Sequence, residues 1–583
     1  MKEFFENVKY TFSNYRKAIL IILSCIALEQ TIFILIPYYM GEIADVLMGG
    51  EGLDYFYQSF PYIVGILLLG ILSRFIFWQR EKAEIKYLSF DLGRNNFMTG
   101  IIHHMGLSGG QHISENSEKR RSTISRGTAS ATTLSQMFFY EILPDIIKTI
   151  IVFIALFIFS PVIGGVVFLV FSINLVLQIR MTSRLMPDFD KWQKMMKKQD
   201  KIAGEHSKNI MLTKNFGQEE RAKREIEEVF LETDNHAKKI WYTFMKKLIT
   251  INSSVPLARG LAMVILAYQV PMGMMTIGEY FFVIMWVNMS MSQVMRVQYF
   301  QRRIMKLLPA FRDLKKEYEV KGDIEVVKNP ISGIIQHGKI EFRDVSFSYK
   351  NNDNAPGLKS ASITILPGQK IGITGASGAG KSTFINLLLR NFDPESGLIE
   401  IDGNDLRLLD LEEYKSTSIG YVSQDNLLFD KSVRYNVAYS GNNISDKEII
   451  KALKIANLHD RIMKHKDGLD AQIGERGINL SGGEKQRLSI ARAVVKSPKI
   501  LIFDEATSSV DSQNEKEIQD TLDRASEGKT MIAIAHRLPT IQNADMILFF
   551  DEGRIAAAGS HEELLQQSEK YAELCSFQSL KVV

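Results

Sequence analysis

The sequence has few cysteines, with only Cys25 and Cys575 among its 583 residues. Two cysteines so far apart in the chain provide neither a disulfide framework nor a metal cluster, and both are interpreted as packing residues. An excess of one charge is also missing, since 70 Lys and Arg against 66 Asp and Glu leave a net charge of +4. This balance gives no reason to expect nucleic acid as a partner.

The chain does have long hydrophobic runs, all in its N-terminal half. A helix that crosses a bilayer needs about 20 largely apolar residues. The first run is not expected to be a cleaved signal peptide, because it is too long and lacks an Ala-x-Ala site. Six stretches meet the length requirement: 18–40, 60–79, 138–160, 161–180, 248–270 and 277–298.

Lysine and arginine are absent from the turns 41–61, 160–161 and 269–278, whereas the N-terminus and the connections 80–137 and 181–247 are rich in them. By the positive-inside rule, the three turns are expected outside and both termini in the cytoplasm. We therefore expect an integral multi-pass membrane protein, located in a bacterial inner membrane.

The two basic connections are long enough to form helical hairpins. Two legs of about 28 residues in 80–137 would reach about 40 Å beyond the bilayer at ~1.5 Å per residue. Glycines stand near both midpoints, at 106–110 and 213–217, as expected for bends. The hairpins predict two contacts with a cytosolic domain, and a pair of solvated charged loops is the alternative.

A chain of this length exceeds one core, and we divide it into a membrane domain (1–308), a charged linker (309–336) and a C-terminal domain (337–583). The C-terminal domain contains short apolar runs that alternate with helical segments. Such continuous runs are typical of strands buried on both faces of a parallel sheet, and the ligands of these sheets bind at the carboxyl ends of the strands. Four runs have this character: 370–374, 419–423, 500–503 and 531–535.

The run 370–374 is followed by a P-loop, Gly375-Ala-Ser-Gly-Ala-Gly-Lys-Ser382. Its glycines let backbone N–H groups surround a polyphosphate, while Lys381 reaches the outer phosphates and the Ser382 hydroxyl ligates Mg²⁺. A chance match in a chain this long is expected in about a few per cent of cases or fewer. The residues expected to bind ATP are Gly375, Ser377, Gly378, Ala379, Gly380, Lys381, Ser382 and Thr383.

The other three strand ends carry groups suited to the same nucleotide. Gln424 is placed to sense the metal or the attacking water, and Asp504 to hold Mg²⁺ through water. Glu505 is expected to be the general base, and His536 to contact the γ-phosphate. Singly, Gln424 or His536 would more often be a surface or core residue, and Asp504-Glu505 a carboxylate pair in a loop. Four strand ends that converge favour an ATP site with Mg²⁺ ligands at Ser382, Gln424 and Asp504.

A second phosphate-binding segment, Leu480-Ser-Gly-Gly-Glu-Lys-Gln-Arg487, has no lysine hook and no metal ligand. It offers Ser481, two glycines and the N-terminus of a helix expected from about Glu484, which together favour an anion. A phosphate site that lacks machinery of its own makes sense if it closes over nucleotide held by another subunit. We therefore predict a dimer, with Ser481, Gly482, Gly483 and Gln486 at the nucleotide.

These motifs resemble the nucleotide-binding domain of ATP-binding cassette (ABC) transporters over residues 337–583. The LSGGEKQR run resembles the family's signature motif, and 375–382 its Walker A loop. The resemblance implies adenine stacking for Tyr349, which could also be ordinary core. It further implies a Q-loop at Gln424, a Walker B aspartate at Asp504, a catalytic glutamate at Glu505 and a switch histidine at His536.

Two further segments carry the resemblance. Ser508-Ser-Val-Asp511 is similar to the D-loop, with Asp511 expected at the nucleotide, although the family more often has alanine and leucine at the middle positions. Gly474-Glu-Arg-Gly477 resembles a segment that in exporters touches the membrane domain. The N-terminal part resembles the six-helix half of an exporter through span count, order and leg length.

The resemblance implies a half-transporter that pairs with a second chain, identical or different. Each ATP would lie between the 375–382 loop of one chain and the 480–487 segment of the other. ATP and Mg²⁺ are the implied cofactors, ATP hydrolysis would drive alternating access, and export is the implied direction. A nucleotide-gated channel is one alternative, but such proteins tend to have lost the base that Glu505 provides. A soluble cassette protein is another, which the apolar runs argue against.

The substrate is less well defined. Glu29 and Arg259 are placed near mid-bilayer, where they could pair with each other, line the route or join packed helices. Asn288, Gln293 and Arg296 lie toward the inner end of the last span, where cavity lining and snorkelling are both open.

Eight methionines in the last two spans and their turn suit a promiscuous hydrophobic pocket or ordinary packing. They are Met263, Met272, Met274, Met275, Met285, Met289, Met291 and Met295. We expect a hydrophobic or amphipathic substrate such as a drug-like molecule or lipid, with a peptide or metal conjugate carried by a heterodimer as the alternative.

Overall fold

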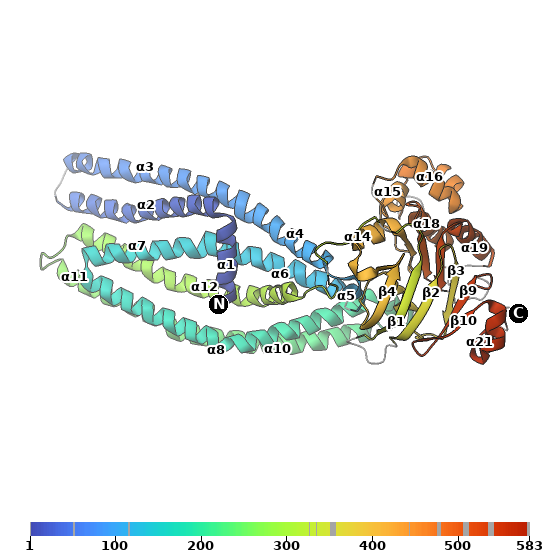
Figure 1. Cartoon of the computed structure of the whole chain (residues 1–583). Coiled ribbons are helices and arrows are strands. Elements are labelled where there is room, and N and C mark those ends of the chain that lie inside the picture. The colour runs from blue at the N-terminus through green and yellow to red at the C-terminus, as the bar shows by residue number, and fades with distance from the viewer. Residues whose placement is uncertain are drawn as a thin grey trace. The chain divides into compact units, whose positions relative to one another are not determined.

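The computed structural model forms two compact units, shown in Figure 1. A helical unit comprises Met1–Met105 and Ser117–Val320, and a cassette unit comprises Gly106–Asn116 and Lys321–Val583. The structure describes residues 2–49, 53–114, 117–325, 327–333, 335–349, 357–441, 443–474, 480–504, 512–534 and 541–579.

The helical unit consists of long helices, two of which contain a π-helical turn. Its first part is α1 (Lys2–Asn14), α2 (Arg16–Met48), α3 (Leu53–Ala83), the π-helical η1 (Glu84–Asp91) and α4 (Leu92–Met105). The second part is α6 (Ser117–Met137), the π-helical η2 (Phe138–Ile142), α7 (Leu143–Phe159), α8 (Pro161–Lys208), α9 (Ile210–Asn215), α10 (Glu219–Asn252), α11 (Ser254–Gln269) and α12 (Ile277–Glu319).

Five helical stretches in the described ranges are long and apolar enough to cross a membrane, and they cover the first five expected spans to within one residue. The sixth expected span, 277–298, lies in α12, where Glu279, Asn288 and Gln293 interrupt the apolar run. It is not among the five and stays a prediction. The five stretches are Arg16–Met48, Leu53–Met105, Lys119–Phe159, Pro161–Lys208 and Glu219–Gln269.

Both expected hairpin bends are confirmed. One lies between α4 and α5 (Gly109–Ser114), and α5 belongs to the compact cassette unit. The other follows α9, where Gly217 adopts a φ of 59°. This left-handed conformation favours glycine, which explains the residue type at the bend.

The linker expected from residue 309 is wrong in its first part, because α12 continues through Pro309 to Glu319. A proline inside a helix costs ~3 kcal/mol, since it removes a hydrogen bond and clashes with the preceding turn. Burial of Leu308 and Leu314 and an ion pair of 2.8 Å between Arg120 and Glu317 hold this end of the helix in place. The boundary between the two units falls at Val320.

The cassette unit contains two sheets. The smaller sheet has the order β2-β1-β4-β5 and is antiparallel. Its strands are β1 (Ile340–Phe347), β2 (Leu358–Ile365), β4 (Ser396–Ile401) and β5 (Asn404–Asp405). The larger sheet has the order β10-β9-β3-β8-β7-β6. Its strands are β3 (Lys370–Gly375), β6 (Ile419–Val422), β7 (Ile500–Asp504), β8 (Thr530–Ile534), β9 (Met546–Asp551) and β10 (Arg554–Gly559).

The four expected strands are confirmed as the adjacent parallel strands β3, β8, β7 and β6. In their register Ile534 of β8 lies beside both Ile373 and Asp504, and Val422 lies beside Phe503. The carboxyl ends of all four strands therefore meet at one edge of the sheet.

Two hydrophobic clusters pack on this sheet. One includes α13 (Lys381–Leu388), whose Phe384 ring stacks on Phe342 of β1 with centroids 4.2 Å apart. The other surrounds α18 (Gly482–Val494) and includes residues of α16 (Asp446–Ile455) and α19 (Ser512–Ser526). The helices that begin at the P-loop and the signature segment are thus both anchored in the core.

Candidate functional site

The P-loop joins β3 to α13 and depends on three glycines with positive φ. Gly375, Gly378 and Gly380 have φ values of 143°, 81° and 100°. A Cβ at Gly375 would lie 2.2 Å from the carbonyl oxygen of Phe550, so no side chain fits there. These glycines let the loop curl so that its amides can converge on a phosphate.

The P-loop lysine lies inside the loop. Lys381 is only 6% exposed, and its Nζ donates hydrogen bonds of 2.8 Å to the carbonyls of Gly375 and Ala376. Ser382, the next residue, is exposed. A buried ammonium group surrounded by carbonyl oxygens can exchange these bonds for phosphate oxygens without a large movement.

Tyr349 lies beside the first turn of α13. Its hydroxyl is 3.2 Å from Thr383 Oγ1, and its ring contacts Phe347 and Phe392 edge-on. The ring is half-buried. The structure therefore places Tyr349 next to the P-loop helix, and its role in adenine stacking stays a prediction.

Asp504 ends β7 at the edge where the strands meet. The Tyr421 hydroxyl donates to Asp504 Oδ2 at 3.3 Å. Burial raises the pKa of Tyr421, and the charge of Asp504 raises it further, so the phenol stays protonated and keeps its role as donor. Gln424 is exposed in the loop two residues after β6.

Several expected site residues lie outside the described part of the chain. They are Glu505, the segment 508–511 with Asp511, and His536, together with all of 474–477 except Gly474. Glu505 and His536 follow the confirmed strands β7 and β8 directly or by two residues. Their catalytic roles stay predictions.

The expected magnesium ligands suit a hard cation. No group of three or more His, Cys, Asp or Glu able to hold a metal occurs among the described residues. Mg²⁺ often takes only one or two protein carboxylates and completes its shell with water and substrate phosphates. The exposed Ser382 hydroxyl, the Gln424 amide oxygen and the Asp504 carboxylate fit that pattern.

The signature segment forms the exposed start of α18. Ser481 caps the helix, since its Oγ accepts from Glu484 N at 3.3 Å and its own N–H donates to Glu484 Oε2 at 2.8 Å. Burial opposes ionisation of Glu484, but hydrogen bonds from Ser481 and Arg461 outweigh it and lower the pKa of this carboxyl. A Cβ at Gly482 would meet nothing within 4 Å among the described residues. The helix N-terminus is therefore open to an anion.

The last two residues of the signature segment are buried, unlike its first residues. Gln486 is only 2% exposed and lies within the core around α18. Arg487 is also buried and donates to Glu517 of α19 at 2.8 Å. The structure thus brings Ser481 and Gly482 to the surface but not Gln486, whose nucleotide contact stays a prediction.

Three exposed rings contact one another in the segment after Gln424, and together with the exposed Leu427 of the same segment we call them the aromatic patch. The rings of Phe429 and Tyr439 lie 4.5 Å apart between centroids, and Tyr435 contacts both. Leu427 is 75% exposed. Tyr435 belongs to α15 (Val433–Ala438).

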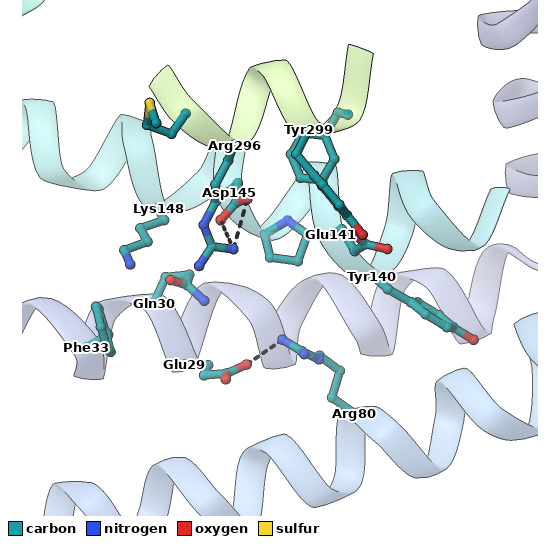
Figure 2. A pocket seen from close by; sticks show the side chains of 13 residues that line it. Glu29, Gln30, Phe33, Arg80, Tyr140, Glu141, Asp145, Lys148, Arg296 and Tyr299 are labelled. Atoms are coloured by element: carbon teal, nitrogen blue, oxygen red, sulfur yellow. Dashed lines mark hydrogen bonds and ion pairs between the residues drawn. The ribbon is translucent and has the colours of Figure 1, made fainter. Parts of the chain in front are cut away.

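The helical unit contains a cavity of about 550 Å³ between α2, α3, α7 and α12 (Figure 2). Charged residues line it on opposite sides. Arg80 Nη1 lies 2.5 Å from Glu29 Oε2, and Arg296 Nη1 lies 3.1 Å from Asp145 Oδ1. The lining residues are Glu29, Gln30, Phe33, Arg80, Tyr140, Glu141, Pro144, Asp145, Lys148, Met295, Arg296, Tyr299 and Phe300.

Glu29 and Arg259, the two charges expected near mid-bilayer, do not pair with each other, although the sequence allowed such a pair. Glu29 pairs with Arg80, whereas Arg259 Nε is buried without a hydrogen-bond partner among the described residues. Arg296 lines the cavity, so the snorkelling alternative is not needed for it. Gln293 is buried and Asn288 half-buried.

The eight methionines do not share one environment. Met291 is fully buried, and Met275 and Met289 pack against the same cluster. Only Met295 of the eight lines the described cavity. Packing is therefore the account for three of the eight, and four others, Met263, Met272, Met274 and Met295, are exposed.

Most of the cavity wall was not predicted from the sequence. Lys148 lies with its Nζ 4.0 Å from the centroid of the Phe33 ring and forms no ion pair with any described residue. Asp145 and Lys148 were detectable as charges inside the apolar run 138–160. Tyr140 was not detectable in this way, because a tyrosine in a membrane helix is common and does not mark a cavity.

Comparison with known proteins gives concordant results. A family model described as "ABC transporter" matches residues 358–508. The ATP-binding cassette sub-family B member 6 of Xenopus tropicalis is 31% identical over 94% of this chain and 64% of its own length. The protein of the same name from Mus musculus is 30% identical over 96% of this chain and 67% of its own length. The chain thus spans about two thirds of these relatives.

A solved structure shares the whole fold. It is a bacterial Atm1-family ABC exporter with ATP bound, which superposes with a TM-score of 0.82 at 27% identity. The match covers 97% of this chain and 98% of the other.

Proposed function

The chain belongs to the ABC transporter family, and we propose that it hydrolyses ATP to export an amphipathic substrate as one half of a dimer. It carries the ATPase domain of that family after a helical membrane domain. The observation that carries the proposal is the meeting of the P-loop, Asp504 and the loop of Gln424 at one edge of the parallel sheet.

At this edge each described residue has a distinct task in hydrolysis. The P-loop amides and Lys381 bind the phosphates, and their positive charge stabilises the negative charge of the transferring phosphoryl group. Ser382, Gln424 and Asp504 would hold Mg²⁺, which neutralises phosphate charge when bound. Tyr421 orients the Asp504 carboxylate through its hydrogen bond. Glu505 is proposed to accept the proton of the attacking water.

The signature segment supports the pairing of two chains. Its helix N-terminus is open, its serine is a cap, and it holds neither a lysine hook nor a metal ligand. A site of this kind can bind phosphate but cannot activate it. We therefore assign it to nucleotide held by the P-loop of a second chain. An identical chain can fill this role, because this chain carries both a P-loop and a signature segment.

The aromatic patch supports a second contact between the chains. The tip formed by α9 and the following turn presents Ile210, Met211, Leu212 and Phe216, each at least 50% exposed. The aromatic patch of the cassette is likewise exposed and apolar. Exposed apolar groups of this size mark interaction sites. The partner's α9 tip is the occupant we propose for the patch.

The cavity supports an amphipathic rather than a purely hydrophobic substrate. The Phe33, Tyr299 and Phe300 rings supply apolar surface, while two ion pairs supply polar surface. The acidic groups Glu29 and Asp145 are already paired with arginines. Lys148 is left as a cation without an ion-pair partner among the described residues, so the favoured substrate carries a negatively charged group.

The test uses the full chain reconstituted in liposomes, with the mass of the complex measured in detergent. We expect a dimer with Mg²⁺-dependent ATPase activity. The transport assay measures ATP-driven uptake of taurocholate, an amphipathic anion, into inside-out vesicles, with tetraphenylphosphonium as the cationic comparison. Glu505→Gln should retain ATP binding and lose nearly all turnover, while Glu527→Gln, an exposed acid before β8, should not. Wild-type turnover in Glu505→Gln would overturn the assignment of the base.

A further inference from the structure

Two π-helical turns flank the cavity of the helical unit. η1 (Glu84–Asp91) connects α3 to α4, and η2 (Phe138–Ile142) connects α6 to α7. π-helical turns are rare and occur frequently at functional sites. Their presence on two neighbouring helices beside one cavity calls for a physical account.

One side chain joins the two turns. The Tyr140 hydroxyl in η2 donates to the carbonyl of Glu84 at 2.6 Å and lies 3.0 Å from Ser89 Oγ. A weaker bond of 3.3 Å runs from Gln136 Nε2 to the carbonyl of Leu88. Tyr140 therefore contacts both the first turn and the middle of η1.

The same residues face the cavity. Tyr140 and Arg80 both line it, as Figure 2 shows, together with Glu29. Arg80 Nε also lies 3.2 Å from Glu84 Oε1. The backbone of Glu84 is thus held by Tyr140 and its side chain by Arg80. An occupant of the cavity can therefore contact both residues that hold Glu84.

We propose that Tyr140 is the positioning residue through which an occupant of the cavity alters the α3–α4 helix. The proposal rests on the exporter function proposed above. A polar group of the occupant draws the Tyr140 hydroxyl away from the Glu84 carbonyl, and η1 loosens because its first residue loses the bond that ties it to η2.

The consequence depends on the order of the chain. α4 starts where η1 ends, and α5 comes next, within the cassette unit. A change of one residue in a helical turn rotates the rest of the helix by about 100°. Even a partial change in η1 therefore changes the orientation of α4 and of α5, which follows it. The cassette can respond to an occupied cavity in this way.

The test replaces the unknown substrate with a covalent occupant. Met295, which lines the cavity, is changed to cysteine in a Cys25→Ala, Cys575→Ala chain reconstituted in nanodiscs. The new thiol is labelled with 2-sulfonatoethyl methanethiosulfonate, which places a small anion in the cavity. Hydrogen exchange of the amides in 84–92 is then measured by mass spectrometry, before and after labelling.

We expect labelling to speed exchange in 84–92 by about tenfold, as for the loss of one hydrogen bond. With Tyr140→Phe added, exchange should be fast before labelling and change by less than about twofold after it. Tyr299→Phe is the matched control, because Tyr299 also lines the cavity but its hydroxyl accepts from Arg303 of its own helix. This control should respond to labelling as the parent does.

Two outcomes would overturn the inference: no change on labelling in the parent, or the same change in the parent and in Tyr140→Phe. The failure of the proposed function looks different. If the parent chain had no Mg²⁺-dependent ATPase activity, the exporter assignment would fail, while the exchange experiment would still decide whether Tyr140 connects the cavity to η1.

Discussion

The amide of Gly110 donates a hydrogen bond of 2.8 Å to the carbonyl of Asn391, so the backbone of α5 touches the cassette without an intervening side chain. Asn391 follows the P-loop helix α13 and accepts a further bond of 3.1 Å from Lys415 Nζ on its side-chain oxygen. The sequence marks 106–110 as a bend, but only the structure shows that its last glycine is a contact point.

Gly110→Val should uncouple the membrane domain from ATP turnover. An added Cβ would lie 2.4 Å from the Asn391 carbonyl oxygen and 2.4 Å from the Phe392 ring, so α5 must move away. We expect ATP-driven taurocholate uptake to fall at least about tenfold, which corresponds to a loss of about 1.4 kcal/mol. ATP binding should persist. Gly204→Ala, where a Cβ meets nothing within 4 Å among the described residues, should leave uptake unchanged.

Tyr421→Phe should weaken the hold on magnesium. The variant removes the hydrogen bond from the Tyr421 phenol to Asp504, while the ring remains. A hydrogen bond of this kind contributes about 0.5–1.5 kcal/mol, so the Mg²⁺ concentration for half-maximal ATPase should rise about two- to tenfold. Tyr242→Phe, on an exposed face of α10, serves as the control. An unchanged Mg²⁺ dependence would remove Tyr421 from the site.

The stability of the cassette should rise with pH above neutrality. Burial lowers the pKa of Lys415 to about 8, with Arg390 adding to the effect, and burial lowers the pKa of Lys496 to about 8. The unfolded chain keeps the lysine pKa near 10.5 and so binds more protons between these values. Stability therefore increases with pH in this window, and the cost of charging these lysines is fully present below pH 8.

The measurement is the thermal unfolding of the full chain in nanodiscs between about pH 7.5 and 9.5, which includes the lower part of this window, where stability should already rise. Lys496→Met should flatten the rise in Tm, because it removes one of the two titrating groups. Lys466→Met changes an exposed lysine and should keep the slope of the parent. A slope that is the same in all three chains would contradict the burial argument.

Lys148 should decide the affinity for an anionic substrate. Lys148→Gln removes the cation over Phe33, and we expect KM for taurocholate to rise about tenfold, or about 1.4 kcal/mol. KM for ATP should stay the same, because Lys148 lies in the helical unit. Lys148→Arg keeps the charge and should restore most of the affinity. Equal KM values in the glutamine and arginine variants would exclude a charge contact.

The sequence predicted those parts of the fold and site that depend on short segments. The strand β7 is recognisable because Ile500 to Phe503 are all apolar and all buried, and the P-loop because its glycines serve a local turn. Pro309 led to the wrong prediction that the helix ends there, whereas its neighbours pack well enough to keep α12 intact. A local proline rule cannot include that tertiary contribution.

Contacts between residues far apart in the chain could not be predicted either, because local sequence rules do not include tertiary packing. Glu29 was recognised as an intramembrane charge, but its partner Arg80 lies 51 residues away on the next helix. The π-helical turns had no sequence signal, because Glu84 to Asp91 resemble an ordinary amphipathic stretch. Gln486 shows the opposite case, because the motif predicts a nucleotide contact for a side chain that is buried in this chain, and that contact stays a prediction.

The sharing of each nucleotide by two chains can be tested by complementation. Lys381→Ala removes the phosphate hook, and Ser481→Arg blocks the open N-terminus of α18, so each variant alone should lose nearly all ATPase activity. In a mixed dimer, both defects fall in one shared site, and the other site combines an intact P-loop with an intact signature segment. Equal mixing gives half mixed dimers with one intact site of two, so about a quarter of the wild-type activity should return.

The arrangement predicts this recovery only if the two halves come from different chains. If each chain bound ATP with its own P-loop and its own signature segment, every site in the mixture would carry one defect. The mixture would then be no more active than its components. The control mixes Lys381→Ala with Lys381→Ala, Ser481→Arg, which leaves every shared site without its lysine and should recover nothing. Dimer formation in each mixture is checked by mass, so that a failure to pair is not mistaken for a failure to share.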